Sequence, residues 1–94
     1  MTVMPVEVRL PTLLREHTGG AASVDADGDT VRALFDLLID EYPGLKGQLV
    51  GDDGELHRFV NVYRNDDDIR YLDRLDTTVG DGDVVSILPA VAGG

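Results

Sequence analysis

The side chains that most often do chemistry form no recognisable catalytic group in this sequence. There is no cysteine, which excludes disulfides, thiolate nucleophiles and thiolate metal sites. The two histidines, His17 and His57, have neither metal-ligand nor catalytic-triad spacing, and we expect both to be ordinary surface or strand-entry residues. The sequence therefore predicts no catalytic residue, no metal site and no cofactor bound by this chain.

Two acidic runs have a structural explanation. Alternate aspartates precede the strongest helical pattern: Asp25, Asp27 and Asp29. This spacing opens a calcium loop, but such a loop needs Gly and Glu where this chain has Thr30 and Asp36. Residues 66–68 are three aspartates that suit a solvated hairpin tip. A phosphate-binding P-loop is also missing, and Lys46 is the only lysine.

The reactive group that remains is the carboxylate of Gly94, at the end of a Gly93-Gly94 pair. We expect a buried strand to end at Leu88 and Pro89 to stiffen the exit, so residues 89–94 form a flexible tail. Glycine has no side chain to clash, so such a tail can enter a narrow channel of another protein. The residues that would thread the channel are Val91, Ala92 and Gly93.

A carboxylate becomes an acylating group only when one of its oxygens is made a leaving group. Adenylation by a partner protein does this by forming a mixed anhydride with AMP. A sulfur nucleophile can then displace AMP and leave a C-terminal thiocarboxylate, which is an anionic nucleophile at neutral pH. The terminal glycine could therefore hold sulfur in a chain without cysteine.

The elements that would position this tail begin with a hairpin and a helix. Alternating apolar residues predict a first strand over 6–10, and 22–26 reads as a second strand antiparallel to it. Residues 12–17 are expected to form a connector. Helical spacing follows in Val31, Leu34, Phe35, Leu38 and Tyr42. Asp29 or Thr30 can cap this helix, and Pro43-Gly44 should end it.

The second half of the chain reads as a loop followed by strands. Glycines and acidic residues make 44–57 a loop, and alternation predicts a strand over 59–64. A turn and a short fourth strand over 69–72 follow, then a final strand over 84–88 that is apolar enough to be buried on both faces. The crossover rule predicts that the strand after the helix is parallel to its neighbour in the sheet.

These elements predict one α+β domain over residues 1–88, with a helix packed on one face of a mixed sheet. This is the plan of the β-grasp, or ubiquitin-like, fold. The length of 94 residues fits one domain, and 43% hydrophobic residues argue against disorder.

The net charge of −10 excludes two classes of partner. Nucleic acids and anionic membrane surfaces would repel this chain, whereas a protein with a basic groove would attract it. The first residues lack the features of a signal peptide, and no apolar run approaches the ~20 residues of a membrane span, so a cytoplasmic location is expected.

Three stretches of the chain resemble a known family, the ThiS/MoaD ubiquitin-like sulfur carriers. They are PTLLREHTGG at 11–20, LHRFVNVY at 56–63 and DGDVVSILPAVAGG at 81–94. The terminal stretch is the most specific, and the loop over 44–55 has no match. Within the family, the chain is most similar to the branch that serves cysteine biosynthesis.

The resemblance implies a β-grasp fold, a cytoplasmic location and an E1-like adenylating and sulfurating partner that uses ATP. Gly94 would bear the sulfur, with Gly93 as its threading neighbour. In the cysteine branch, a pyridoxal-phosphate cysteine synthase uses the thiocarboxylate on O-phosphoserine, and a zinc peptidase releases the product. ATP, pyridoxal phosphate and zinc would belong to these partners. Related carriers serve molybdopterin, thiamin and thiosugar pathways.

Two other functions stay open. A ubiquitin-like modifier would share the adenylation step but form isopeptide bonds with lysines, and a plain interaction module would make no use of its tail. For any partner, we expect the docking surface to be an apolar patch rimmed by acidic groups. The residues predicted to form it are Phe59, Tyr63, Leu88 and Pro89.

Overall fold

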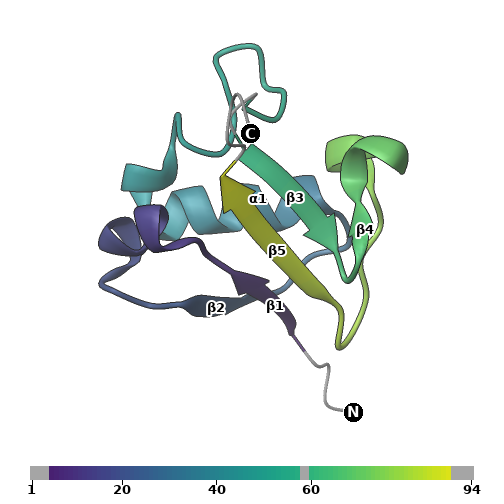
Figure 1. Ribbon diagram of the computed structural model, residues 1–94, viewed down its shortest axis with the longest axis horizontal. Helices are drawn as coiled ribbons and strands as arrows, with labels where there is room; N and C mark the ends of the chain where they lie inside the picture. The colour runs from purple at the N-terminus through teal and green to yellow at the C-terminus, as the bar shows by residue number, and fades with distance from the viewer. Residues whose placement is uncertain (1–4, 58–59, 90–94) are drawn as a thin grey trace.

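A computed structural model of the chain describes residues 5–57 and 60–89 and shows a sheet with one main helix across it (Figure 1). The strands are β1 (Val6–Arg9), β2 (Ser23–Ala26), β3 (Val60–Arg64), β4 (Asp67–Asp68) and β5 (Val84–Pro89). The helix is α1 (Val31–Glu41). Four short 3-10 helices complete the described elements: η1 (Thr12–Thr18), η2 (Pro43–Leu45), η3 (Ile69–Tyr71) and η4 (Arg74–Asp76).

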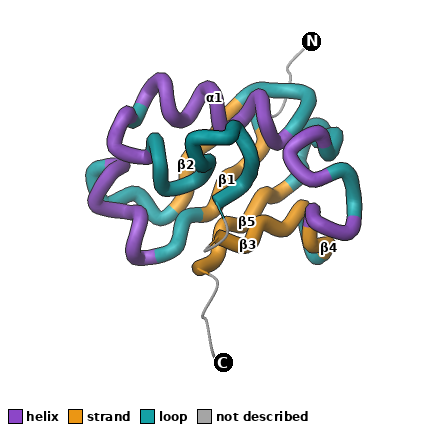
Figure 2. Tube along the Cα trace, turned by 90° about the horizontal axis from the view of Figure 1, so that it is seen from above, coloured by secondary structure: helices purple, strands orange, loops and turns teal. Residues whose placement is uncertain are grey.

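The sheet is mixed and has five strands in the order β2-β1-β5-β3-β4. β1 and β5 are parallel, and the other neighbouring pairs are antiparallel. α1 lies against one face of this sheet (Figures 1 and 2). The arrangement confirms the predicted β-grasp fold.

The predicted direction of the strand after the helix was wrong with respect to its neighbours. β3 is antiparallel to both β5 and β4. It runs parallel to β2, the strand that precedes α1, and β1 and β5 lie between these two strands in the sheet. The crossover through α1 therefore skips the central pair, which is filled by the first and last strands.

The helix forms as its sequence predicts. The Thr30 side chain caps it by accepting a hydrogen bond from the Ala33 N–H at 3.2 Å. The apolar stripe is buried against the sheet at Val31, Leu34, Phe35 and Leu38. Burying side chains of this size contributes about 1.5–3 kcal/mol each, so this stripe is a main source of stability.

The final strand is buried on one face, and the prediction of burial on both faces was wrong. Val85 and Ile87 are buried, whereas Leu88 is exposed. The reason is that helices cover only one side of the sheet, so the strand alternates despite its apolar composition. β5 also includes Pro89.

Two local elements differ from the sequence-based expectation. The connector after β1 forms the 3-10 helix η1, which ends at Gly19 in the left-handed conformation with φ 69°. The short strand expected over 69–72 is instead the 3-10 helix η3. Its start is fixed by the Asp68 side chain, which accepts a hydrogen bond from the Arg70 N–H at 2.9 Å.

Candidate functional site

The sequence places the reactive carboxylate in a segment outside the described residues. Val91, Ala92, Gly93 and Gly94 lie beyond Pro89, the last residue that the structure describes, and Phe59 also lies outside the described residues. The site can therefore be built from the strand that leads to the tail and from the surfaces beside it.

β5 is an anchored base for the tail because it pairs with a strand on each side. Its parallel partner is β1, with Val8 opposite Val85. Its antiparallel partner is β3, with Val60 opposite Pro89 at the end of the strand. A segment leaving β5 therefore starts from the middle of the sheet, close to η1 and to the beginning of β3 (Figure 1).

Two of the predicted interface residues share the sheet face that α1 does not cover. Tyr63 lies opposite Ser86, and Asn61 lies opposite Leu88. Their neighbours Val62 and Ile87 are buried on the helix side, so strand alternation places Tyr63 and Leu88 on the open face. Leu88 is 47% exposed, so its side chain offers apolar surface at the end of β5.

An apolar groove borders this face where β5 ends. Its described lining comes from η1 and the segment before it, from the loop before β3, and from strands β3 and β5: Pro11, Leu13, Leu14, Gln48, His57, Val60, Ile87, Leu88 and Pro89. Leu13 is 65% exposed on its edge. Leu88 and Pro89, two predicted interface residues, therefore belong to the groove, and sequence reasoning missed the contribution of η1.

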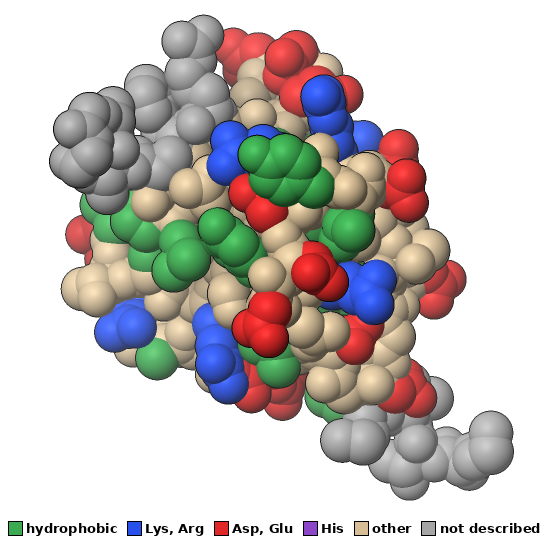
Figure 3. Space-filling model, turned by 45° about the vertical axis from the view of Figure 1, so that its right-hand side comes forward, with side chains coloured by type: hydrophobic (Ala, Val, Ile, Leu, Met, Phe, Trp, Pro, Cys, Tyr) green, Lys and Arg blue, Asp and Glu red, His purple; other side chains and the backbone are tan. Residues whose placement is uncertain are grey.

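Charged side chains of both signs surround this groove, so the acidic rim stays a prediction. A hollow that shares His57 and Val60 with the groove is lined by Asp53 and Glu55, together with Arg70 and Arg74. A neighbouring hollow that shares Pro11, Leu13 and Leu88 is also lined by Arg9 and Arg15, and no carboxylate is among its described lining residues. Figure 3 shows a band of hydrophobic side chains across one face, while many acidic side chains lie toward its margins. Three acidic residues lie over 66–68, in the turn after β3 and in β4.

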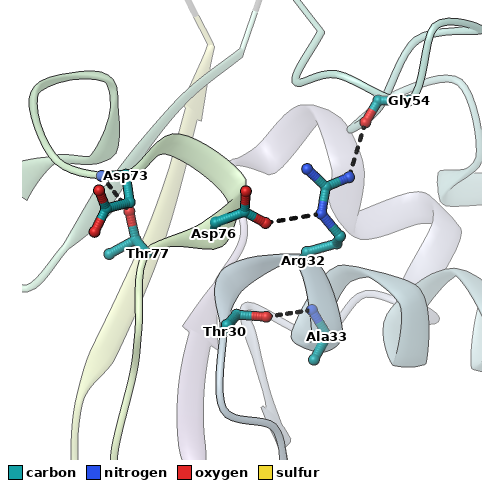
Figure 4. A network of polar contacts seen from close by, with 7 residues as sticks. All are labelled: Thr30, Arg32, Ala33, Gly54, Asp73, Asp76 and Thr77. Atoms are coloured by element: carbon teal, nitrogen blue, oxygen red, sulfur yellow. Dashed lines mark hydrogen bonds and ion pairs between the residues drawn. The ribbon is translucent and has the colours of Figure 1, made fainter.

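Arg32 of α1 binds the loop over 44–55, the loop without a match in the family resemblance (Figure 4). The Arg32 Nη1 atom donates to the Gly54 carbonyl at 3.2 Å, and the Arg32 Nε atom donates to Asp76 Oδ1 at 3.2 Å. One guanidinium thus joins α1, η4 and the loop. No sequence motif could have revealed this contact, since Arg32 and Asp76 are 44 positions apart.

The turn that starts β5 is held by Asp83. Its Oδ2 atom accepts from the Gly80 N–H at 2.9 Å and its Oδ1 atom accepts from Asn65 Nδ2 at 3.3 Å. These two hydrogen bonds, followed by the nearby Arg64 guanidinium, hold the pKa of the Asp83 carboxyl below its ordinary value. The carboxyl therefore acts as a structural anchor in its ionised form.

Within residues 5–57 and 60–89, no cluster of three or more histidine, aspartate or glutamate side chains could hold a metal ion. His17 lies in η1 beside Glu16, and His57 lines the groove. In the same described part of the chain, no helix has the length and apolar character needed to cross a membrane.

Comparisons with known proteins agree with this arrangement. The model of the ThiS family matches residues 8–94, a range that includes the diglycine. The chain is 52% identical to the sulfur carrier protein CysO of Mycobacterium tuberculosis over 93 residues, which is 97% of this chain and all of that protein.

A modifier and a solved complex are also similar. Small archaeal modifier protein 3 of Haloferax volcanii is 40% identical over 94 residues, covering 97% of this chain and all of that protein. A chain in the crystal structure of the Amycolatopsis orientalis BexX/CysO complex is 50% identical with a TM-score of 0.87, covering 95% of this chain and 99% of that one. These similarities support the sulfur-carrier hypothesis and the fold together.

Proposed function

Since this chain belongs to the ThiS family of sulfur carriers, we propose that it carries sulfur as a thiocarboxylate on Gly94. The observation that bears most on the proposal is the match to a sulfur carrier along nearly the whole chain. The family match extends through Gly94 itself. In this account the chain is a co-substrate of partner enzymes, and its own side chains do no catalysis.

The chemistry takes place in two transfers on the terminal carboxyl. First, a carboxylate oxygen of Gly94 attacks the α-phosphorus of ATP on an E1-like partner, and pyrophosphate leaves. Second, a hydrosulfide ion attacks the carbonyl carbon of the acyl-adenylate, and AMP leaves with the original oxygen. The carbon then carries sulfur in place of that oxygen, and the proton of the hydrosulfide goes to solvent.

The fold supports this role through rigidity close to the tail. β5 pairs with β1 as far as Ser86 and with β3 as far as Pro89, so the tail extends from a strand that is held in the sheet. The groove and the open face beside Leu88 provide apolar surface that a partner can cover. Catalytic groups and ATP would be supplied by the partner.

We assign the sulfur to cysteine biosynthesis on the basis of the similarity to CysO. A pyridoxal-phosphate cysteine synthase would use the thiocarboxylate on O-phosphoserine, and a zinc peptidase would free the cysteine from the carrier. All of these steps belong to the cytoplasm. The complex of BexX with a related carrier supports the use of a partner protein.

The similarity to small archaeal modifier protein 3 favours a second candidate function. In a modifier, a lysine amine of another protein would attack the same activated carbonyl and form an isopeptide bond. Both functions need adenylation of Gly94, and they differ only in the nucleophile.

Intact-mass spectrometry separates the two candidates. The purified chain is incubated with ATP, sulfide and the E1-like enzyme of the same genome, with omission of ATP as the control. A sulfur carrier gains the mass of sulfur for oxygen, whereas a modifier yields a series of larger protein adducts. An unchanged mass with ATP present would contradict both.

A further inference from the structure

β2 is an edge strand whose outer side pairs with no strand of the described residues. It lies at one end of the sheet order β2-β1-β5-β3-β4, beside β1 alone (Figure 1). The strand at the opposite edge, β4, has only two residues, whereas β2 has four. An edge strand presents backbone N–H and C=O groups that can pair with another chain. No residue of β2 lines the groove at the end of β5, so this edge is a separate surface.

The register of the sheet shows which backbone groups of β2 point outward. The Leu10 N–H donates to the Ala22 carbonyl at 2.9 Å, which makes these two residues a hydrogen-bonded pair of the β1–β2 ladder. Such pairs alternate with non-bonded pairs, so Val24 also faces β1, whereas Ser23 and Asp25 direct their N–H and C=O groups away from it. Both residues are exposed, and no backbone hydrogen bond to another described element uses these groups.

The side chain of Asp25 has a like charge directly opposite it. Asp25 is in register with Glu7, in a non-hydrogen-bonded pair, where facing side chains approach most closely. Glu7 forms an ion pair with Arg9 at 2.6 Å, whereas no cation of the described residues forms one with Asp25. Like charges directly opposite each other destabilise a sheet, so a cation from another chain would relieve this repulsion.

On the helix side of the sheet, apolar surface borders the seam between β2 and α1. Val24 is half-buried against the core. The segment after β2 packs on one flank of α1, because a Cβ atom at Gly28 would lie 3.1 Å from Ala33 Cβ and 3.2 Å from Leu34 Cδ2. Leu37 follows these two helix residues by one turn, so it lies on the same flank, and it is 42% exposed. A strand added to β2 would cover this apolar surface.

We propose that the outer edge of β2 binds an extended segment of a partner protein as a further strand, and that the side chains of this segment alternate between basic and apolar. The backbone of the segment would pair with Ser23 and Asp25. Its side chains on one face would meet the Asp25 carboxylate, and those on the other face would meet Val24 and Leu37. This proposal goes beyond the proposed function and does not depend on the fate of Gly94.

The charge around this edge favours a basic occupant. The net charge of the chain is −10. A hollow beyond the end of β2 is lined by Asp27, Asp29 and Asp81, and no lysine or arginine is among its described lining residues. A basic segment is therefore attracted to this edge. A second copy of this chain is disfavoured, because pairing of two β2 strands would bring two acidic edges together.

NMR titrations of the whole chain with defined peptides test the proposal. The probe is a peptide of about six residues that alternates arginine and valine and has both ends blocked. One control peptide has the same composition, with the arginines and the valines grouped in two blocks. Two further peptides are methylated on the backbone nitrogens of the arginines only or of the valines only. A strand paired with β2 donates to it through only one of these two sets of nitrogens.

Each variant of the chain has a matched control. Ser23→Pro removes an N–H that points outward and leaves the ladder to β1 intact, whereas Ser23→Ala keeps that N–H. Asp25→Asn is compared with Asp36→Asn, which makes the same change in charge at an exposed position of α1. Leu37→Ser is compared with Leu13→Ser, since Leu13 is exposed in the groove. Unfolding midpoints show that each variant is folded.

We expect the alternating peptide to shift the amide signals of Ser23 and Asp25 most strongly. Ser23→Pro should weaken binding about tenfold, because the backbone pairing is interrupted. Asp25→Asn should weaken it about two- to fivefold, as loss of an exposed ion pair does, and Leu37→Ser should weaken it by a similar factor. The three control variants should bind as the wild type does. Methylation of one set of nitrogens should abolish binding, and methylation of the other set should be tolerated.

Equal binding of the alternating and the block peptide would overturn the proposal, because charge alone would then explain the interaction. Equal effects of the two methylated peptides would also overturn it, as would equal affinities of Asp25→Asn and Asp36→Asn. Amide shifts centred on the groove at the end of β5 would place the peptide elsewhere and contradict the proposal. Shifts of Ser23 and Asp25 that depend on the concentration of the chain alone would make a second copy the occupant and overturn it.

Discussion

Leu88 of β5 lies directly opposite Asn61 of β3, on the face of the sheet that α1 leaves open. The pair is one residue before the end of the strand, and Leu88 is 47% exposed although its neighbour Ile87 is buried. An apolar side chain therefore stands in solvent at the point where the tail leaves the fold. The exposed side chain is therefore available for contact with a partner, which the next experiment tests.

Replacing Leu88 with serine should weaken binding to the adenylating enzyme several-fold and leave the fold intact. The side chain makes a smaller contribution to the core than its buried neighbours, so we expect a stability loss below about 1 kcal/mol. The measurements are a binding titration and a urea unfolding curve. Leu72→Ser is the control, because Leu72 is 41% exposed and belongs to a different surface. Equal loss of affinity in both variants would contradict the assignment of Leu88.

A methyl group at Gly44 should destabilise the protein, because it would meet His17. A Cβ atom at Gly44 would lie 2.6 Å from His17 Nδ1 and 3.4 Å from its Cβ, so the side chain that packs η1 onto η2 would have to move. Overpacking of this kind costs about 1–3 kcal/mol. The free energy of unfolding in urea measures the effect in Gly44→Ala.

Gly80→Ala is the matched control for that change. Nothing lies within 4 Å of a Cβ atom at Gly80, and this glycine has no positive φ. We expect it to be neutral or to stabilise by up to about 1 kcal/mol through the unfolded chain. A Gly44→Ala protein as stable as Gly80→Ala would show that η1 is not held against η2 by this contact.

As the pH falls, the free energy of unfolding should decrease more steeply in the wild type than in an Asp83→Asn variant. The pKa of Asp83 is lowered in the folded state by the hydrogen bonds from Gly80 and Asn65. Its contribution to stability is therefore present above the unfolded pKa of about 3.9 and is lost as the pH falls through the lower folded value. Urea midpoints from neutral to acidic pH measure the slope, and Asp81→Asn is the control on the same turn. If the urea midpoint fell equally with decreasing pH in the wild type and in Asp83→Asn, this role of Asp83 would be contradicted.

Removing the Arg32 guanidinium should release the loop over 51–55 without unfolding the domain. Arg32→Gln loses the contacts to Gly54 and Asp76, both at the surface, and we expect a global cost of about 1 kcal/mol. Amide exchange at Gly54 and Glu55 should accelerate while exchange in α1 stays slow. Unchanged exchange in the loop would mean that other contacts hold it.

Elements with strong local signals could be predicted from the sequence. The spacing of Leu34, Phe35 and Leu38 together with the Thr30 cap located α1, and the family resemblance supplied the fold. The predictions that were wrong depend on distant parts of the chain. The apolar composition of β5 resembles that of a strand buried on both faces, yet Leu88 is exposed because one face of the sheet has no helix.

The short strand expected over 69–72 shows a second limit. Ile69 is buried, as a strand residue would be, but the Asp68 side chain bonds to the Arg70 N–H and turns the backbone into η3. Such a local hydrogen bond competes with strand pairing and has a weak sequence signal.

The candidate site was predictable only in part. The tail was predicted from its small residues and from the family resemblance, and Leu88 and Pro89 were expected near it. The groove brings in Leu13 and the neighbouring hollow brings in Arg15, which precede the start of β5 by 71 and 69 positions in the sequence. One signal could have indicated them: two adjacent leucines, Leu13 and Leu14, in a short turn cannot both point into the core, and the structure buries only Leu14.

Tandem mass spectrometry of the C-terminal peptide, isolated after reaction with ATP, the sulfur source and the adenylating enzyme, tests the central claim most directly. The account predicts that every fragment containing Gly94 has one oxygen replaced by sulfur, while fragments that end before Gly94 keep their original mass. Sulfur on any other residue, or an unmodified Gly94 in a preparation that passes sulfur to its acceptor, would contradict it.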